Sequence, residues 1–541
     1  MINNKNSVAI NWRFLLISFC ILIALIAIIY KIFSIQFLDS NFLKNEGNKR
    51  YIKYKDVVSV RGSIFDRNEF PLAVSIVNYD IYALNGFTKT QLLKLSEKVD
   101  LDIEVIEESF GKKTLLKKNI SNKQLTAIKN LKLENFEIEL RHSRHYPLGD
   151  QIAPLIGFYG RDGAQEGLEK SYDRVLAGQT GRQKYFKNAK QEIISQPIET
   201  SKTIQGKDIY LTIDATIQFF AYKYLAEAVH DNKAEAGSVI ILDNKNGEVL
   251  AIASYPSYNP NHPQRKIQKN RALVEAYELG SVLKPIVLSK AIDKEIITDD
   301  EYIEIPRRLK LNDKVIVDSK TYERLTPQEI IAFSSQVGAS KVALKLGYDN
   351  LKRNYYDFGF TKPISINFPS SSFGYMNIKE KVSDKELASL GYGYGLKVSP
   401  FQIASAYSVF ANNGVYKDFQ LLLNEQVTSR KVISDQSAAY ILKALEKVVK
   451  EGTGKAAEIR GFSEGGKTGT AHQTRRGSGY AEDSYISSFI GITPLSEESL
   501  TIFVSIDNPG LNAYTGGAVA APLFAKIAES SLNHLGYFED E

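Results

Sequence analysis

The sequence predicts an α/β fold preceded by one apolar helix, and three observations support this prediction. An almost wholly apolar run occupies residues 14–30. Strand patterns occur over residues 209–254 and again over residues 485–506, with a helical block between them. A sheet that takes strands from both ends of a region and carries helices on its faces is an α/β/α sandwich. The length of 541 residues exceeds one ordinary domain and indicates two domains plus the apolar segment.

Composition narrows the class of protein. A hydrophobic content of 43% with 24% charged residues is typical of globular proteins. The net charge of +6 is too small for this length to indicate nucleic-acid binding, although it suits an anionic surface such as lipid headgroups. Cys20 is the only cysteine, so no intramolecular disulfide can form. The six histidines are scattered, and we expect neither a metal site nor a cofactor.

The apolar run predicts a transmembrane anchor at residues 12–33, after a cytoplasmic tail of residues 1–11. A helix of that length spans about 33 Å, enough for a hydrocarbon core of roughly 30 Å. No small-residue cleavage site follows, so an uncleaved anchor is favoured over a signal peptide or a buried core helix. Basic residues on both sides leave the orientation undecided (Lys5 and Arg13 before; Lys31, Lys44, Lys49 and Arg50 after).

Residues 34–205 contain no catalytic constellation and are predicted to be a non-catalytic domain. Residues 71–75 indicate a strand, residues 88–136 have the periodicity of short helices, and residues 187–207 are polar and broken, as in an interdomain connection. Arg61, with Asp66 and Arg67 nearby, could bind a ligand, but a structural salt-bridge network is the favoured interpretation.

From Asp208 the pattern changes, and we expect a second domain over residues 206–541. The predicted elements are a strand, an amphipathic helix, a hairpin, an antiparallel strand pair beside the strand that carries Lys467, and a final helix. Their expected ranges are 209–214, 215–230, 237–242 with 249–254, 485–492 with 499–506, and 518–535.

The candidate nucleophile is Ser281, three residues before Lys284. Gly280 allows a turn into a helix predicted by the apolar run that follows, and Pro285 is tolerated in a first helical turn. Free N–H groups at a helix N-terminus favour developing negative charge. A lysine one turn away and kept neutral by burial could take the serine proton. The pattern therefore predicts a serine–x–x–lysine nucleophile.

Alone this motif is weak, and Ser109 with Lys112 is a second match. Two further motifs follow Ser281 in order: Ser334–Ser335–Gln336 and the single Lys467–Thr468–Gly469. Serine–lysine, then serine–amide, then lysine–threonine–glycine is the signature of serine penicillin-recognising enzymes. Ser365 with Asn367 is a formal alternative to Ser334, but it lies among prolines and serines, and Ser334 is preferred.

Beyond these motifs, the chain resembles the class B penicillin-binding proteins, the peptidoglycan D,D-transpeptidases, over nearly its whole length after the anchor. The segments that carry the resemblance are RGSIFDRN with PLAVS, GLEKSYD, AGSVIILDNKNGEVLAIASYPSYNPN, YELGSVLKP, SSQVGASK, YGYGLKVSPFQIA, GGKTGTA and YTGGAVAAPLF. The sequences of these segments are most similar to those of the division (septal) subgroup, and the elongation subgroup is the alternative.

The resemblance implies an architecture and a location. Residues 34–205 would be the pedestal, or dimerisation-type, domain, and residues 206–541 the transpeptidase domain with a five-stranded antiparallel sheet flanked by helices. The protein would be single-pass in the bacterial inner membrane, with its catalytic domain on the periplasmic side. Implied partners are stem peptides ending in D-Ala-D-Ala, β-lactams, a membrane-embedded glycan polymerase and divisome proteins, but no nucleic acid.

The resemblance also implies the catalytic roles. Ser281 would attack the carbonyl between the two terminal D-alanines, with Lys284 as base. Ser334 would relay protons to the leaving amine and from the acceptor amine, and Lys467 would supply positive charge beside it.

Substrate contacts are implied as well. Thr468 and Thr470 would bind the substrate carboxylate, and Gly469 would let an extended peptide lie against its strand. The backbone N–H groups of Ser281 and Thr470 would form the oxyanion hole.

Two residues depart from the family pattern. Gln336 stands where asparagine is usual, and its extra methylene moves the amide by about 1.5 Å. That change bears on its contacts with Lys284 and the substrate's acyl side chain, and it favours the alternative of a catalytically impaired scaffold or β-lactam sensor. Leu279 replaces a common proline before Gly280. A β-lactamase shares the serine motifs, but the anchor, the pedestal and the lack of a recognisable deacylating loop argue against it.

Overall fold

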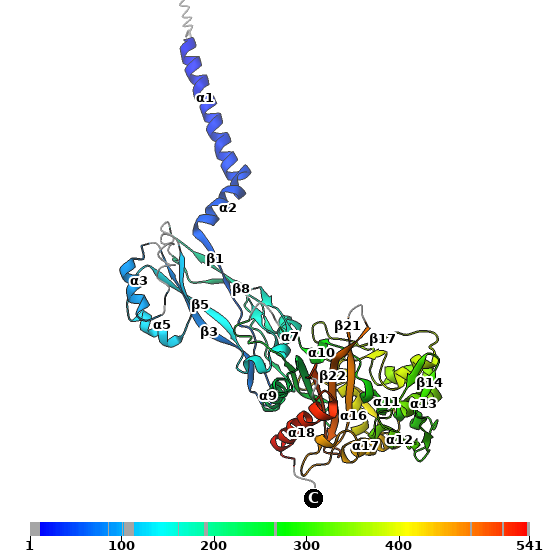
Figure 1. Ribbon diagram of the computed structural model, residues 1–541. Helices are drawn as coiled ribbons and strands as arrows, with labels where there is room; N and C mark the ends of the chain where they lie inside the picture. The colour runs from blue at the N-terminus through cyan, green and yellow to red at the C-terminus, as the bar shows by residue number, and fades with distance from the viewer. Residues whose placement is uncertain are drawn as a thin grey trace, which may run out of the picture. The chain divides into compact units, whose positions relative to one another are not determined.

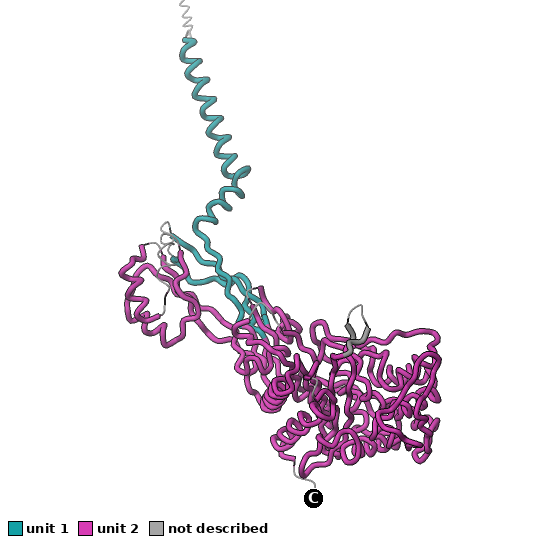
Figure 2. The backbone as a smooth tube through the Cα atoms, in the orientation of Figure 1, with its two compact units in different colours: residues 1–60, 177–206 teal, residues 61–176, 207–541 magenta. Residues whose placement is uncertain are grey.

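The computed structural model describes residues 11–84, 86–99, 101, 113–160, 162–188, 193–263, 268–475, 479–510 and 513–537. The chain divides into two compact units (Figure 2). Unit 1 comprises residues 1–60 and 177–206, and unit 2 comprises residues 61–176 and 207–541. Each unit therefore draws on two separate stretches of the chain.

Unit 1 begins with the apolar helix α1 (Trp12–Phe33), drawn in blue in Figure 1. None of its residues is buried, and its large apolar side chains are exposed on every side, as in a helix surrounded by lipid. With the π-helical turn η1 (Ser34–Leu38) it is long and apolar enough to cross a membrane, judged by length and composition. The prediction of an N-terminal membrane-spanning helix agrees with this observation.

The rest of unit 1 is the helix α2 (Ser40–Tyr51) and a three-stranded antiparallel sheet. The strands are β1 (Ile52–Val57), β8 (Gly181–Phe186) and β9 (Ile198–Ser201), in the order β1-β8-β9. The predicted connection over residues 187–207 is wrong at β9. All four β9 residues are exposed, so backbone pairing rather than burial makes the strand, and no apolar pattern marks it.

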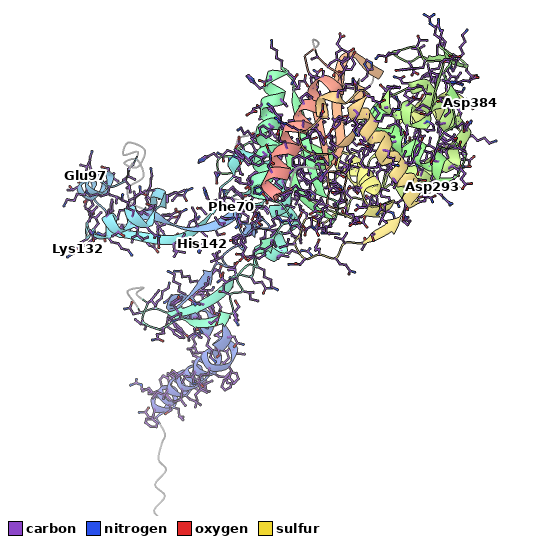
Figure 3. All side chains as sticks on the ribbon, turned by 90° about the horizontal axis from the view of Figure 1, so that it is seen from below. Phe70, Glu97, Lys132, His142, Asp293 and Asp384 are labelled. Atoms are coloured by element: carbon purple, nitrogen blue, oxygen red, sulfur yellow. The ribbon has the colours of Figure 1, made fainter. Side chains whose placement is uncertain are left out.

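In unit 2, residues 61–176 and the short strand Ile209–Tyr210 form a small sheet covered by two helices. Its strands run in the order β10-β2-β3-β4, with β5 also paired to β3. The helices α3 (Lys89–Ser96) and α5 (Asn122–Lys129) bury Leu92, Leu95, Leu125 and Ile128 in the core of this sheet. Figure 3 shows Glu97 and Lys132 at the end of this layer. The strands are β2 (Ile64–Phe65), β3 (Pro71–Ala83), β4 (Thr114–Ile120), β5 (Phe136–His145) and β10 (Ile209–Tyr210).

The structure differs from two of the sequence predictions in this region. The expected short helices over residues 88–136 exist, but β4 lies between them and was missed. The strand expected over residues 209–214 is only Ile209–Tyr210, and it pairs in parallel with β2 of the small sheet rather than with the large one. Which strand β10 pairs with depends on residues far away in the chain, so the local sequence does not indicate it.

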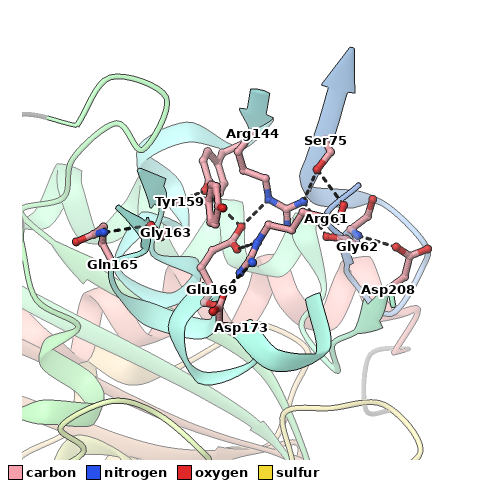
Figure 4. A network of polar contacts seen from close by, with 12 residues as sticks. Arg61, Gly62, Ser75, Arg144, Tyr159, Gly163, Gln165, Glu169, Asp173 and Asp208 are labelled. Atoms are coloured by element: carbon pink, nitrogen blue, oxygen red, sulfur yellow. Dashed lines mark hydrogen bonds and ion pairs between the residues drawn. The ribbon is translucent and has the colours of Figure 1, made fainter. Parts of the chain in front are cut away.

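Basic and acidic residues near Arg61 form a buried network (Figure 4). Glu169 is fully buried and accepts hydrogen bonds from Arg61 Nε at 2.7 Å and Arg144 Nε at 2.6 Å. Arg61 Nη1 also forms an ion pair with Asp173 Oδ1 at 2.6 Å. Asp66 instead accepts backbone N–H groups, including that of Ala215 at 3.0 Å. The structural interpretation of Arg61 is confirmed.

Short elements connect this network to the remainder of unit 2. Arg67 pairs with Glu248 at 3.1 Å. The connecting elements are η2 (Gly149–Gln151), α6 (Ala153–Ile156), the hairpin of β6 (Tyr159–Gly160) and β7 (Gly163–Ala164), α7 (Gly167–Ser171) and α8 (Asp173–Leu176).

The centre of unit 2 is a five-stranded antiparallel sheet in the order β12-β11-β23-β22-β21. Both faces are covered, so β11 and β23 are buried along nearly their whole length rather than at alternate residues. The strand β21, which carries Lys467, is at the edge. The strands are β11 (Ala236–Asp243), β12 (Glu248–Tyr255), β21 (Gly465–Arg475), β22 (Gly479–Thr493) and β23 (Leu500–Asp507).

One face of this sheet is covered by α9 (Ala215–Asp231) and α18 (Gly516–Leu535), whose apolar side chains form a core with Val239 and Phe489. A helical block covers the other face, against Ile240 and Phe503. Its helices are α10 (Arg271–Val274), η3 (Gly280–Leu283), α11 (Lys284–Asp293), α12 (Pro327–Ala332), α13 (Gln336–Leu346), α14 (Tyr348–Asp357), α15 (Asp384–Gly391), α16 (Pro400–Ala411), α17 (Asp435–Lys450) and η4 (Lys455–Ala457).

Four short strand pairs complete the helical block. They are β13 (Ile303–Glu304) with β16 (Arg324–Leu325), β14 (Leu309–Leu311) with β15 (Lys314–Ile316), β17 (Tyr375–Met376) with β18 (Leu396–Lys397), and β19 (Val415–Lys417) with β20 (Ser429–Lys431). The predicted α/β sandwich with a five-stranded antiparallel sheet is confirmed.

Candidate active site

Ser281 lies in the 3₁₀ turn η3, and Lys284 is the first residue of α11. Gly280 has a φ of +59°, a conformation that favours glycine and turns the chain into the helix. The turn is closely packed: a Cβ on Gly393 would lie 1.9 Å from the Gly280 carbonyl oxygen. Ser281 itself is half-buried. The predicted turn and helix are both present.

The side chains of Lys284 and Lys467 converge on Ser334. Lys284 Nζ donates to Ser334 Oγ at 3.1 Å and also to the Ser334 carbonyl oxygen. Lys467 Nζ donates to Ser334 Oγ at 3.0 Å and to the Thr468 carbonyl oxygen at 3.0 Å. Residues from three distant motifs thus meet at one hydroxyl.

Burial shifts the protonation of both lysines. Each is 0% exposed. Burial lowers the pKa of Lys284 to about 7, against a smaller raising effect of Asp318. Burial also holds the pKa of Lys467 well below its usual range, and the charge of Lys284 lowers it further. A buried lysine near neutrality can serve as a proton acceptor for a neighbouring hydroxyl.

Ser334 is held in an unusual backbone conformation before α13. Its φ is +60°, outside the range that a serine normally adopts. Asp318 secures the next residues: its carboxylate accepts from Ser335 Oγ at 2.5 Å, from Gln336 N at 2.6 Å and from Val337 N at 3.1 Å. Sequence reasoning missed Asp318, because a lone aspartate 17 residues before Ser335 carries no pattern.

Ser365, the formal alternative to Ser334, does not join this cluster. Ser365 Oγ donates to the Phe419 carbonyl oxygen at 2.6 Å. Ser109 and Lys112 lie outside the described residues. Ser334 is therefore the motif serine that the structure places between the two lysines.

Lys467, Thr468, Gly469 and Thr470 lie consecutively on the edge strand β21. Thr468 Oγ1 is 2.7 Å from Thr453 Oγ1, and Thr470 Oγ1 accepts from Gly516 N at 3.0 Å. Within the described part of the chain, β21 pairs only with β22, so its other edge is available to an extended peptide.

Gly469 has a packing reason for lacking a side chain. A Cβ there would lie 2.4 Å from Ser488 Oγ and 2.8 Å from the Leu279 carbonyl oxygen. The glycine thus lets the turn that carries Ser281 sit directly on β21. Leu279 is 1% exposed and belongs to the core, so the replacement of the usual proline is accommodated by burial.

Gln336 is exposed and lines a cavity of about 560 Å³ beside the cluster. Tyr392, Tyr394 and His472 also line it. The Gln336 side chain therefore borders this cavity. Together, a half-buried serine, two buried lysines and an open strand edge form a site suited to acyl transfer through a serine ester.

Comparisons with known proteins agree with this geometry. Residues 237–529 match the family model of the penicillin-binding protein transpeptidase domain, and residues 56–211 match that of the penicillin-binding protein dimerisation domain. The chain is 34% identical over 519 residues to a probable peptidoglycan D,D-transpeptidase, PenA, of Neisseria gonorrhoeae, covering 93% of this chain and 89% of the relative. It is 31% identical over 538 residues to the peptidoglycan D,D-transpeptidase FtsI of Escherichia coli, covering 96% and 91%.

Solved structures agree as well. Penicillin-binding protein 3 of Mycobacterium tuberculosis aligns with a TM-score of 0.70 at 25% identity, covering 90% of this chain and 98% of that one, and that protein has also been solved with aztreonam. A peptidoglycan synthetase from Bifidobacterium adolescentis aligns with a TM-score of 0.73 at 22% identity over 91% of this chain and 98% of that one, which supports the fold.

Proposed function

We propose that this chain, which belongs to the class B penicillin-binding proteins, cross-links the stem peptides of septal peptidoglycan as a membrane-anchored serine D,D-transpeptidase. The observation that carries the proposal is the meeting of Lys284, Ser334 and Lys467 at one hydroxyl, one turn from Ser281. The relatives named FtsI and PenA support the septal form over the elongation form.

In the acylation step, Ser281 Oγ attacks the carbonyl between the two terminal D-alanines of a donor peptide. Lys284, whose pKa burial lowers to about 7, accepts the serine proton. The backbone N–H groups of Ser281 and Thr470 stabilise the oxyanion. The C–N bond then breaks, a serine ester forms, and the terminal D-alanine leaves as an amine after Ser334 Oγ donates its proton to the leaving nitrogen.

In the second step the acceptor amine attacks the ester carbonyl. Ser334 takes a proton from that amine, the ester C–O bond breaks, and Ser281 recovers its proton from Lys284. Lys467 keeps a positive potential beside Ser334 in both steps. In the acylation step, Thr468 and Thr470 bind the carboxylate of the terminal D-alanine before that residue leaves. Gln336 contacts the acyl side chain of the donor from the wall of the neighbouring cavity.

The domain assignment is residues 1–11 as a cytoplasmic tail, 12–33 as the anchor, 34–205 as the pedestal and 206–541 as the transpeptidase domain. We place the anchor in the bacterial inner membrane and the catalytic domain on the periplasmic side. β-Lactams, which mimic D-Ala-D-Ala, would acylate Ser281. A membrane-embedded glycan polymerase and divisome proteins are the proposed protein partners.

The test is fluorescent-penicillin labelling of the full-length chain in detergent, followed over hours. Wild type and Ser109→Ala should label stably, and Ser281→Ala should not label. Equal labelling of Ser281→Ala would assign the nucleophile elsewhere. Rapid loss of label would indicate a β-lactamase, and an unlabelled wild type would favour the scaffold or sensor alternative.

A further inference from the structure

A second cavity, of about 530 Å³, lies beside the candidate active site. Residues 274–278, which lead into the turn of Ser281, form one wall. Asp507 at the end of β23 and Ala236 at the start of β11 are paired across the sheet and form another. His472 of β21 lines both this cavity and the one beside Gln336. The two cavities therefore flank the strand edge just beyond Thr470.

Asp507 has a buried carboxylate oxygen that no described residue contacts by a hydrogen bond. The residue is 7% exposed, and Oδ1 has no hydrogen-bond partner among the residues that the structure describes. The other oxygen, Oδ2, is 3.5 Å from Arg271 Nη1, which lies closer to Glu275 Oε1 at 2.8 Å. Burial raises the pKa of Asp507 to about 6, so the group is mostly ionised at neutral pH. A buried acceptor of this kind is stabilised by a donor that enters from the cavity.

The charge of the cavity favours a cationic donor. Four carboxylates line it, against two basic side chains (Glu235, Glu275, Glu278 and Asp507; Lys269 and Arg271). The four minus two leave a net charge of −2. Both basic groups are already paired with Glu275, at 2.7 Å for Lys269 and 2.8 Å for Arg271. An added ammonium group would offset the remaining negative charge.

The position along β21 indicates which part of a substrate reaches the cavity. A donor peptide whose carboxylate lies at Thr468 and whose scissile carbonyl lies at Thr470 continues along the strand by about 3.3 Å per residue. By that spacing, the residue before the acylated alanine lies beside Ala471, next to His472, which lines both cavities. The side chain of that substrate residue can enter the anionic cavity.

We propose that this cavity binds the side-chain ammonium group of the donor stem peptide, on the residue that precedes the alanine acylated by Ser281. The inference rests on the proposed function. Donor and acceptor strands are copies of one polymer, so a donor carries the same amino group with which an acceptor attacks. An anionic cavity keeps that amine protonated and unreactive. The acceptor amine must instead lose its proton, which an anionic cavity would oppose.

The test compares two depsipeptide donors on the full-length chain in detergent: Nα-acetyl-L-lysyl-D-alanyl-D-lactate and its norleucyl analogue, which lacks the amine. Release of D-lactate gives kcat/KM for acylation. We expect wild type to prefer the lysyl donor about tenfold, the effect of one charge-assisted hydrogen bond. Asp507→Asn should lose most of that preference. The control Asp349→Asn, an exposed carboxylate outside the cavity, should keep it.

The outcomes separate the two proposals. Two outcomes would overturn the ammonium site and leave the transpeptidase proposal intact. One is an equal rate for both donors in wild type, and the other is a preference for the lysyl donor that persists in Asp507→Asn. If Asp507→Asn melts far below wild type, Glu275→Gln replaces it and should weaken the preference too. No acylation by either donor or by penicillin would instead contradict the proposed function.

Discussion

The two buried lysines are the most informative residues of the candidate site. Lys284 and Lys467 are fully buried and share one hydroxyl partner, Ser334 Oγ. Two charged ammonium groups in one buried place would be costly, because burial and mutual repulsion both disfavour the protonated form. A proton is therefore easily removed from this pair, which suits the task of activating Ser281.

This protonation argument predicts the pH dependence of acylation. Because burial lowers the pKa of Lys284 to about 7, its neutral, proton-accepting form increases as the pH rises through 7. The rate of penicillin acylation should rise between pH 6 and pH 8 and level off above. Stopped-flow acylation of the wild-type chain over pH 5.5 to 9 measures this. A rate that keeps rising toward pH 10.5 would indicate an ordinary lysine.

At the scale of elements, the contact between η3 and β21 fixes where Ser281 lies relative to Lys467. Gly469 leaves no room for a Cβ, which would meet Ser488 Oγ at 2.4 Å and the Leu279 carbonyl oxygen at 2.8 Å. A methyl group there must push the turn and the strand apart. The spacing of the nucleophile from the oxyanion donor would change with it.

Gly469→Ala should therefore lower the acylation rate by at least about tenfold, since displacements of about 1 Å in an active site can cost a hundredfold. Fluorescent-penicillin kinetics measure the loss, and a melting curve shows whether the fold remains. The double variant Gly469→Ala/Ser488→Ala removes the closest contact and should recover part of the rate. An unchanged rate in the single variant would contradict the packing argument.

The second element to test is the N-terminus of α13. Asp318→Asn keeps the shape of the side chain but removes the charge that accepts two backbone N–H groups of the helix and Ser335 Oγ. We expect a loss of about 1 kcal/mol in stability, as for other helix caps, and slower acylation because Ser334 is held less firmly.

The matched control for Asp318 is Asp313→Asn. Asp313 is exposed on the turn between β14 and β15 and pairs with Lys385 at 2.9 Å. Exposed pairs of this type contribute little, so melting temperature and acylation should both stay near wild type. If Asp318→Asn and Asp313→Asn had equal melting temperatures and equal acylation rates, Asp318 would not position Ser334.

At the scale of the whole molecule, one buried ion network joins segments far apart in the chain. Glu169 of α7 holds Arg61 before β2 and Arg144 of β5, and the ring of Tyr159 lies 4.6 Å from the Arg61 guanidinium. The side chains of Arg61 and Arg144 are themselves buried. Their charges therefore depend on Glu169 for compensation.

Glu169→Gln should destabilise unit 2 by about 3–5 kcal/mol, because it removes the buried carboxylate that the guanidinium groups of Arg61 and Arg144 share and leaves Arg61 only the half-exposed Asp173. Thermal unfolding of the purified chain should show a clear fall in melting temperature, whereas the exposed Glu97→Gln should not change it. A melting temperature equal to wild type would mean that water or Asp173 replaces the lost charge.

Much of this protein could be predicted from local sequence. The apolar run of α1, the helix α9, the hairpin of β11 and β12, and the final helix α18 were all predicted within a few residues, because burial on a regular element leaves a periodic pattern. The three motifs were also recognisable, since short stretches around Ser281, Ser334 and Lys467 carry their own spacing.

Other features were decided only by the tertiary structure. Strand β9 has no buried face, β10 joins the small sheet, and Asp318 reaches α13 across a loop. The Asp507 oxygen that has no partner among the described residues is likewise defined by its surroundings. A sequence pattern records which side of an element is buried. It does not record which distant residue comes to lie there, because that depends on how all the elements pack together.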